Sequence, residues 1–128
     1  MKKIYPAIFK RNSSGYEICF PDVDEVVVEA ENIAEGLEFA SERLGRGLGT
    51  LVEKNVTLPT PSPINTLSID SEKEFATLIS VDLNDYLKDT QLDKKTIKIP
   101  HWLNVRATKE GINFSKTMTE ALAKKLNI

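Results

Sequence analysis

The alternation of hydrophobic and polar residues predicts three strands near the start of the chain. Residues 3–10 form a first alternating run, Asn-Ser-Ser-Gly at 12–15 is a turn signal, and residues 16–20 alternate again. Two half-buried runs joined by a glycine-containing turn predict a β-hairpin. The three consecutive valines at 26–28 are β-branched and predict a third strand.

A helix is predicted from Asn32 onward. Asn32 suits a helix N-cap, and Glu35 three residues later completes a capping-box pattern. Gly45, Gly47 and Gly49 each cost about 1 kcal/mol in a helix interior. Close packing against the sheet or an early frayed helix end would explain them, and both explanations stay open. The apolar residues at helical spacing, which predict a buried stripe, are Ile33, Leu37, Ala40, Leu44, Leu48, Leu51 and Val52.

The middle of the chain predicts a connector, one more strand and a hinge. Three prolines within 57–63 predict an extended, semi-rigid segment. Residues 75–81 are mostly apolar or β-branched and predict a strand, which 83–87 follow as a short helix. The polar residues 89–93 predict a hinge.

The C-terminal segment has a different pattern of strand, helix and helix. Residues 96–99 alternate polar and apolar side chains and end at Pro100. Residues 102–110 predict a short helix that Gly111 closes. Asn113 is a suitable N-cap for the last helix. The apolar residues of that helix at helical spacing are Phe114, Met118, Ala121, Leu122 and Leu126.

This C-terminal segment is expected to pair with a second copy of itself. About 35 residues cannot build a self-sufficient core, although the segment carries many apolar residues. Two short strands, one from each chain, would form an antiparallel ribbon with its apolar side chains facing the helices. The predicted dimer core consists of Ile97, Ile99, Trp102, Leu103, Met118 and Leu122.

The same arrangement predicts DNA binding. A two-stranded ribbon fits the major groove, where polar side chains reach base edges. A helix N-terminus with free backbone N–H groups is a phosphate site. A dimerisation unit without DNA binding is the alternative. The predicted DNA-binding residues are Lys94, Thr96 and Lys98 on the ribbon, and Asn113, Phe114, Ser115 and Lys116 at the start of the last helix.

Charge is distributed unevenly between the two parts of the chain. Residues 94–128 contain eight basic and two acidic residues, a net charge of +6. The remaining residues include nine basic and seventeen acidic ones, a net charge of −8. The basic part at 94–128, the tail, suits a polyanion. The acidic remainder, the body, suits a cationic protein, so two partners of opposite charge are expected. A solvated basic helix would give the same distribution.

Composition excludes several other classes of protein. Of the 128 residues, 41% are hydrophobic and 28% are charged, which is typical of a globular chain. No apolar run has the length of a membrane span, and the first residues lack the long apolar core of a signal peptide, so a cytoplasmic location is expected. Cys19 is the only cysteine, which excludes an intrachain disulfide and a cysteine metal cluster. No metal or cofactor is expected.

Two short motifs in the N-terminal part resemble the HicB antitoxin family. They are Tyr-Pro-Ala-Ile-Phe at 5–9 and Phe-Pro-Asp at 20–22, with a Gly-Tyr turn at 15–16 between them. The helix from Asn32 and the Leu-Pro-Thr-Pro-Ser segment at 58–62 are similar to the same family.

The resemblance has one departure and one extension. The family often has a glycine shortly after the Pro-Asp pair, whereas this chain reads Val-Asp-Glu-Val at 23–26, so the loop there is expected to differ. Residues 94–126 resemble the ribbon-helix-helix family. In that family alternate strand residues read bases, and the N-terminus of the second helix holds a phosphate. The order of the two parts matches HicB proteins that carry a ribbon-helix-helix.

The resemblance implies an α+β fold. The expected N-terminal domain is a partial ribonuclease-H-like antiparallel sheet with one main helix, over residues 1–88 with a core at 3–64. A hinge at 89–93 and a ribbon-helix-helix DNA-binding domain at 94–128 are expected to follow. The ribbon would make a homodimer, and contacts between N-terminal domains would extend it to a tetramer.

The implied partner is a HicA-like toxin, a small basic ribonuclease, and the implied function is that of a type II antitoxin. Such a protein masks its toxin and represses its own operon by binding operator DNA. Opposite charge would steer the toxin toward the acidic body. The candidate toxin-binding residues, by charge and position, are Asp22, Asp24, Glu25, Glu29 and Glu31.

Two other functions are compatible with parts of this sequence pattern. A stand-alone ribbon-helix-helix repressor with a ligand-sensing or oligomerisation domain would have the same two-part chain. A nuclease would need several converging carboxylates, yet Asp22 and Asp24 sit beside a turn and no third carboxylate is obvious. His101 lacks a Ser or Cys partner at a recognisable spacing. Cys19 lies in a predicted strand and is expected to be a small buried hydrophobic residue and not a nucleophile. The chain is therefore not expected to be an enzyme.

Overall fold

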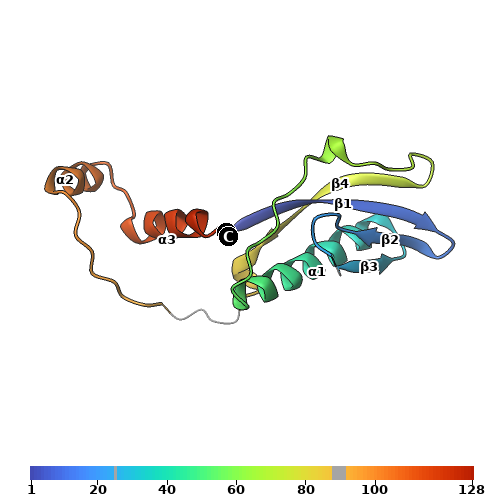
Figure 1. Cartoon of the computed structure of the whole chain (residues 1–128), viewed down its shortest axis with the longest axis horizontal. Coiled ribbons are helices and arrows are strands. Elements are labelled where there is room, and N and C mark those ends of the chain that lie inside the picture. Colours follow the sequence, from blue (N-terminus) through green and yellow to red (C-terminus); the bar gives the residue numbers. More distant parts are fainter. Residues whose placement is uncertain (25, 88–91) are drawn as a thin grey trace. The chain divides into compact units, whose positions relative to one another are not determined.

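The computed structural model describes residues 1–24, 26–87 and 92–128 (Figure 1). They belong to two compact units, Met1–Leu87 and Lys88–Ile128. The first unit holds a four-stranded sheet and the long helix, and the second holds two shorter helices. The fold is α+β, as expected. Three residues of the predicted hinge, 89–91, lie outside the described residues.

The sheet of the first unit is antiparallel throughout. Its strands are β1 (Lys2–Asn12), β2 (Gly15–Cys19), β3 (Val27–Ala30) and β4 (Glu74–Asp82), in the order β3-β2-β1-β4. All four lie where alternation and β-branched residues predicted strands. The hairpin of β1 and β2 is confirmed as well.

Pro6 lies within β1, a central strand of the sheet, and the pairing explains why it is tolerated. Proline has no N–H to donate and is normally confined to sheet edges. The pairing of β1 with β2 begins only at Ile8 opposite Cys19. Before that point β1 has β4 as its single neighbour, with Pro6 opposite Leu78. The proline therefore lies on a locally unpaired side of the strand.

Helix α1 (Ile33–Glu53) begins at the predicted cap. The side chain of Asn32 accepts a hydrogen bond of 2.8 Å from the backbone N–H of Glu35. The Glu35 carboxylate accepts in turn from the N–H of Glu31, at 3.3 Å, one residue earlier than a capping box requires. The helix continues through all three glycines, so a frayed end does not explain them.

The face of α1 that meets the sheet differs in part from the predicted stripe. Ile33 and Leu37 are 43% and 39% exposed. A Cβ on Gly36 would lie 2.8 Å from Cε2 of Phe9, so the helix begins its contact with the sheet at this glycine. The buried positions of α1 are Gly36, Ala40, Leu44, Gly45, Leu48 and Gly49.

Two further glycines of α1 bring Tyr86 against the helix. Tyr86 follows the short 3-10 helix η2 (Leu83–Asp85), which stands where a short helix was predicted. A Cβ on Gly45 would collide with the Tyr86 ring, and one on Gly49 would lie 3.1 Å from the Tyr86 carbonyl oxygen. Close packing therefore explains these glycines, although the partner at both positions is Tyr86 and not a strand.

An aromatic stack joins two strands of the sheet, and a hydrogen bond holds the segment after α1. Phe9 stacks on Phe75 with ring centroids 4.8 Å apart, so β1 and β4 are joined through the core. The Tyr5 hydroxyl donates to the carbonyl oxygen of Pro59 at 2.5 Å. This bond holds the proline-rich segment, which has the predicted extended form before the 3-10 turn η1 (Ile64–Thr66).

The second unit contains α2 (His101–Lys109) and α3 (Phe114–Lys125), close to the predicted helices. Gly111, at φ +71°, ends the first of them in the left-handed region that glycine adopts easily. The Asn113 side chain caps the second by accepting from the N–H of Lys116 at 3.0 Å. In this single chain 94–99 has no strand pairing, and a ribbon of the predicted kind would require a second chain.

Candidate functional surfaces

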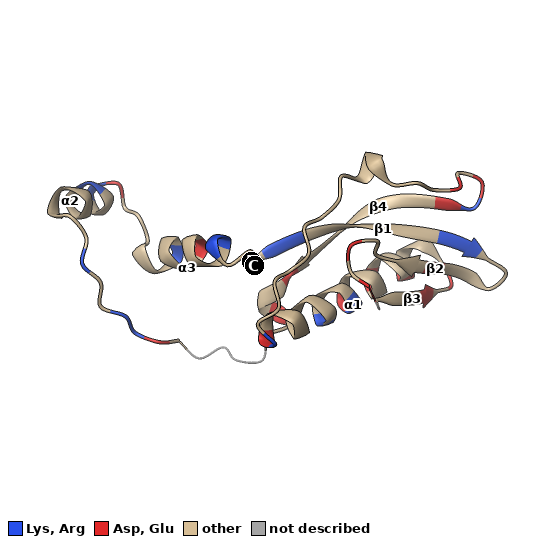
Figure 2. Cartoon of the chain, viewed as in Figure 1, with Lys and Arg blue, Asp and Glu red and all other residues tan. Residues whose placement is uncertain are grey.

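Helix α1 covers one face of the sheet and leaves charged residues on the other. Phe9 and Ile18 face the helix, since both would touch a Cβ on Gly36. Neighbouring strand residues point to the opposite face. The strand register places Glu29 opposite Glu17, Glu17 opposite Lys10, and Lys10 opposite Glu74. One row of three acidic residues and a lysine therefore crosses all four strands; Figure 2 shows the charged positions along the ribbon.

Apolar residues follow this charged row on the same face. The next row holds Val27, Cys19, Ile8 and Ala76, and the rows beyond hold Pro6 opposite Leu78 and Ile4 opposite Ser80. Three of these side chains are about half exposed: Val27 at 49%, Ile4 at 51% and Leu78 at 53%. Pro6, in the middle of these rows, is fully buried. We call this set of rows, from Glu29 to Ile4, the uncovered sheet face, because α1 does not pack on it.

The electrostatics of Cys19 agree with this geometry. Burial raises the pKa of the Cys19 thiol, and the nearby carboxylates of Glu17 and Glu74 raise it further. Lys10 acts in the opposite direction. The three charged groups that influence the thiol all belong to the charged row, so the row and the thiol lie on one face.

Asp22, one of the five acidic residues predicted to bind a cationic partner, has a structural role in this unit. Its carboxylate accepts hydrogen bonds from the backbone N–H of Ser62, at 2.8 Å, and from the Ser62 hydroxyl, at 2.5 Å. Both carboxylate oxygens are engaged, and together they fasten the segment after α1. The Asp22 carboxylate also raises the pKa of Tyr5, after the larger effect of burial.

The remaining candidates occupy different surroundings. Asp24 lines a pocket of about 370 Å³ that Arg43, Arg46 and Lys54 also line, so cations surround its charge. Glu29 is exposed on the uncovered sheet face. Glu31 is exposed just before α1. Glu25 lies outside the described residues.

Glu17 belongs with Glu29 and was missed by sequence reasoning. The alternation of residues 16–20 already placed Glu17 on the polar side of its strand. The missing information was the register of β2 against β3, which sets Glu17 directly opposite Glu29. That register depends on packing across the sheet and cannot be read from one strand alone.

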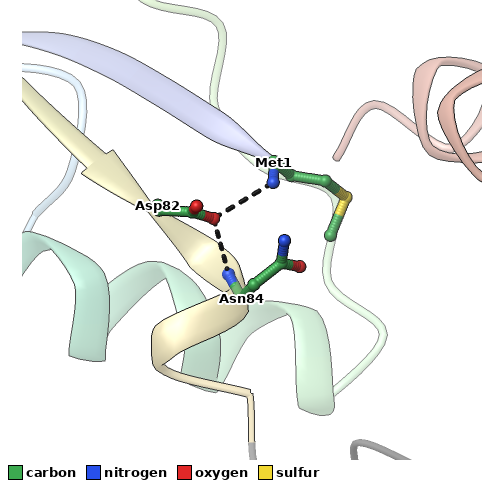
Figure 3. A network of polar contacts seen from close by, with 3 residues as sticks. All are labelled: Met1, Asp82 and Asn84. Atoms are coloured by element: carbon green, nitrogen blue, oxygen red, sulfur yellow. Dashed lines mark hydrogen bonds and ion pairs between the residues drawn. The ribbon is translucent and has the colours of Figure 1, made fainter. Parts of the chain in front are cut away.

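A polar network ties the start of β1 to the end of β4 (Figure 3). The carboxylate of Asp82 accepts from the Met1 ammonium group at 3.1 Å and from the N–H of Asn84 at 3.0 Å. The hydrogen bond from the ammonium group is the main reason why the pKa of Asp82 lies below its ordinary value, followed by the bond from Asn84.

The second unit exposes apolar side chains in the single chain. None of the residues in α2 or α3 is buried. Trp102 is 63% exposed, Leu122 54% and Ile97 52%. All six residues of the predicted dimer core are among the large hydrophobic residues exposed here: Ile97, Ile99, Trp102, Leu103, Met118 and Leu122.

The predicted DNA-binding residues lie in two places in the second unit. Lys94, Thr96 and Lys98 are exposed on the segment before α2, and Asn113 to Lys116 form the start of α3. The side-chain oxygen of Asn113 is used in the helix cap, where it accepts from the backbone N–H of Lys116.

Neither a membrane span nor a metal centre was found in the described parts of the chain. Among 1–24, 26–87 and 92–128, none of the helices has the length and apolar character needed to cross a bilayer. In the same residues, His, Cys, Asp and Glu side chains do not gather in a group of three or more that could hold a metal ion.

No protein family model matches the chain, but curated relatives and solved structures do. The antitoxin HicB of Escherichia coli K12 is 35% identical over 52 residues, which cover 41% of this chain and 38% of that relative. The HicB of E. coli O157:H7 matches equally. The match to these curated relatives thus spans little more than a third of their length.

Solved structures match over nearly the whole chain. One chain of a toxin-antitoxin complex from Streptococcus pneumoniae is 34% identical, with 98% of this chain and 99% of that chain covered and a TM-score of 0.65. The crystal structure of the Burkholderia pseudomallei antitoxin HicB has a TM-score of 0.67, with 98% and 99% covered. At 23% identity the second match shows a shared fold.

Proposed function

This chain belongs to the HicB family of antitoxins, and from that premise we propose that it binds and masks a small basic, HicA-like RNA-cleaving toxin. One observation supports this most directly. The chain is 34% identical, over almost its full length, to a chain of a toxin-antitoxin complex. The proposed role is stoichiometric inhibition and not catalysis, in the cytoplasm.

The charge of the first unit suits such a partner. The residues before Lys94 carry a net charge of −8, while those from Lys94 onward carry +6. A cationic protein is drawn to the acidic part by long-range attraction, which speeds association and disfavours wrong partners. Inhibition then requires only that the bound unit cover the surface on which the toxin holds RNA.

We propose a second activity for the second unit: as a ribbon-helix-helix dimer it binds operator DNA at its own promoter. Support comes from the apolar residues that the single chain leaves exposed and from the capped start of α3 among basic residues. A second copy would bury those side chains and pair the segments at 94–99. Lys94, Thr96 and Lys98 would then lie on the outer side of the ribbon.

Co-expression tests the antitoxin role against a stand-alone repressor. The partner to use is the small basic protein encoded beside the gene for this chain. A stable complex in pull-down, together with restored growth of cells that express the partner, is the expected result. If neither complex nor rescue is observed, the antitoxin role is rejected and a stand-alone DNA-binding repressor becomes the better description.

Lys98→Ala tests the DNA-binding role in the full-length chain. We expect weaker binding to promoter DNA in a gel-shift assay, with toxin neutralisation unchanged. Lys54→Ala is the control, since Lys54 is also an exposed lysine but lies in the first unit. DNA affinity should also fall as salt rises, because lysine–phosphate contacts release counterions. If Lys98→Ala abolished toxin binding, the proposal that the first unit binds the toxin and the second binds DNA would be wrong.

A further inference from the structure

The uncovered sheet face combines features that a free protein surface rarely keeps together. Val27, Ile4 and Leu78 are each about half exposed within neighbouring rows. The charged row borders them at one end, with three carboxylates and a single lysine. An exposed apolar area with a charged border is typical of a protein-binding surface.

The pair Glu17 and Glu29 adds a more specific observation. Directly opposed residues of an antiparallel pair have Cβ atoms about 5 Å apart, and like charges in such a pair are destabilising. Both residues are exposed, and Lys10 is the one basic residue in their row. The chain thus keeps an arrangement that weakens the sheet and that a cation from outside would relieve.

We propose that the uncovered sheet face is the surface on which the cationic toxin docks. This inference rests on the proposed antitoxin function. The side chains of Ile4, Leu78 and Val27 form the apolar contact, and Glu17 and Glu29 together receive a lysine or arginine of the partner. Charge selects this occupant over a second copy, since a second copy would bring its own acidic row to the same face.

The other acidic candidates are less suited to that role. Asp22 has both carboxylate oxygens bonded to Ser62. Asp24 shares its pocket with Arg43, Arg46 and Lys54, so its attraction for an external cation is reduced.

Glu29→Lys tests the charged half of the proposal in the full-length chain. The partner is again the small basic protein encoded beside the gene, and affinity is measured by titration calorimetry. We expect binding to weaken about tenfold. The thermal midpoint of the free chain should rise, because the new lysine faces Glu17 and replaces a repulsion by an attraction. A variant that only damaged the fold would lower both the affinity for the partner and the thermal midpoint.

Glu38→Lys is the matched control for charge, since Glu38 is exposed on α1. For the apolar half, Leu78→Ser is compared with Leu37→Ser, an exposed leucine of α1. We expect Leu78→Ser to weaken binding about tenfold, and the two α1 variants to bind within about twofold of the wild type.

The outcomes separate this inference from the antitoxin role. If the wild-type chain does not bind the partner, both are overturned. If the wild type binds and the two sheet-face variants bind equally well, only the docking surface is wrong. If Leu78→Ser leaves toxin affinity intact but lowers the mass of the free chain in light scattering, the face is an interface between copies and the proposal also fails.

Discussion

Gly36 determines how closely α1 approaches the sheet. A Cβ at this position would lie 2.8 Å from a ring carbon of Phe9 and 2.9 Å from a methyl carbon of Ile18. Both side chains are fully buried, so neither can move without disturbing the core. The residue is therefore required for packing, although glycine is a poor helix former.

We predict that Gly36→Ala lowers the free energy of unfolding by up to about 2 kcal/mol. Overpacking a core costs about 1–3 kcal/mol, which outweighs the gain of about 1 kcal/mol in helix propensity. Urea denaturation of the full chain measures the change. Gly47→Ala is the control, because its Cβ would meet only one methyl carbon, of Val26, at 3.1 Å. Equal losses in both variants would contradict the prediction.

The lowered pKa of Asp82 predicts a dependence of stability on pH. The folded state favours the charged form of Asp82. The contribution of this carboxylate to the free energy of unfolding is therefore complete above the ordinary carboxyl pKa. It is lost as the pH falls through the lowered pKa. Asp82→Asn should therefore lower the thermal midpoint at neutral pH, and the difference from the wild type should disappear in acid. A difference that stays constant over this range would exclude the linkage.

At the level of single residues, local patterns were predictable and long-range partners were not. Asn32 and Asn113 were expected as helix caps, because a cap depends on residues within three positions. The bond of Asp22 to Ser62 joins residues forty positions apart. No local pattern indicates such a contact, so the sequence could not predict this structural role of Asp22.

At the level of elements, the strands and helices were predictable and their faces only in part. Both strands of the hairpin were located correctly, and the alternation of β2 placed Ile18 in the core. The alternation expected in β1 is only partly present, because Tyr5, Pro6 and Ala7 are buried in succession and Ile4 is half exposed. The apolar spacing in α1 also included Ile33 and Leu37, which the structure leaves exposed. The buried face of α1 includes Gly36 and Gly45 instead. Glycine is needed at these positions because neighbouring side chains lie too close to the helix for a Cβ atom, which a hydrophobicity pattern does not reveal.

The helices of the second unit predict association with a second chain. Leu122 of α3 is 54% exposed in the single chain. An aspartate there would place a charge in the apolar surface that the dimer would bury. We expect Leu122→Asp to produce a monomer in light scattering and to abolish DNA binding. Glu120→Asp, on the same helix, should leave the dimer intact. A dimer that survives Leu122→Asp would place the interface elsewhere.

At the scale of the whole molecule, the division of charge follows the division into compact units. The acidic part lies mainly in Met1–Leu87 and the basic part in the unit that begins at Lys88. The sequence indicated this organisation through composition, which needs no knowledge of contacts. The sequence could not predict the proposed docking surface of the first unit, because that surface depends on the register of strands that are distant in sequence.

A chain that ends at Leu87 should keep one activity and lose the other. We expect it to bind the toxin with an affinity within about threefold of the full chain, because the first unit has its own core. DNA binding should be lost in a gel shift. Thermal unfolding of the truncated chain provides the control for folding. If the truncated chain still bound the promoter, the DNA site would have to lie in the first unit.

The position of Cys19 gives the molecule a built-in chemical reporter. The thiol is the chain's only one, and it lies partly accessible in the first apolar row of the uncovered sheet face. Its raised pKa keeps it mostly protonated at neutral pH, so alkylation is slow and accelerates in mild alkali. The rate at which a small reagent labels this thiol therefore measures, without any substitution, what fraction of the molecules has that face open to solvent.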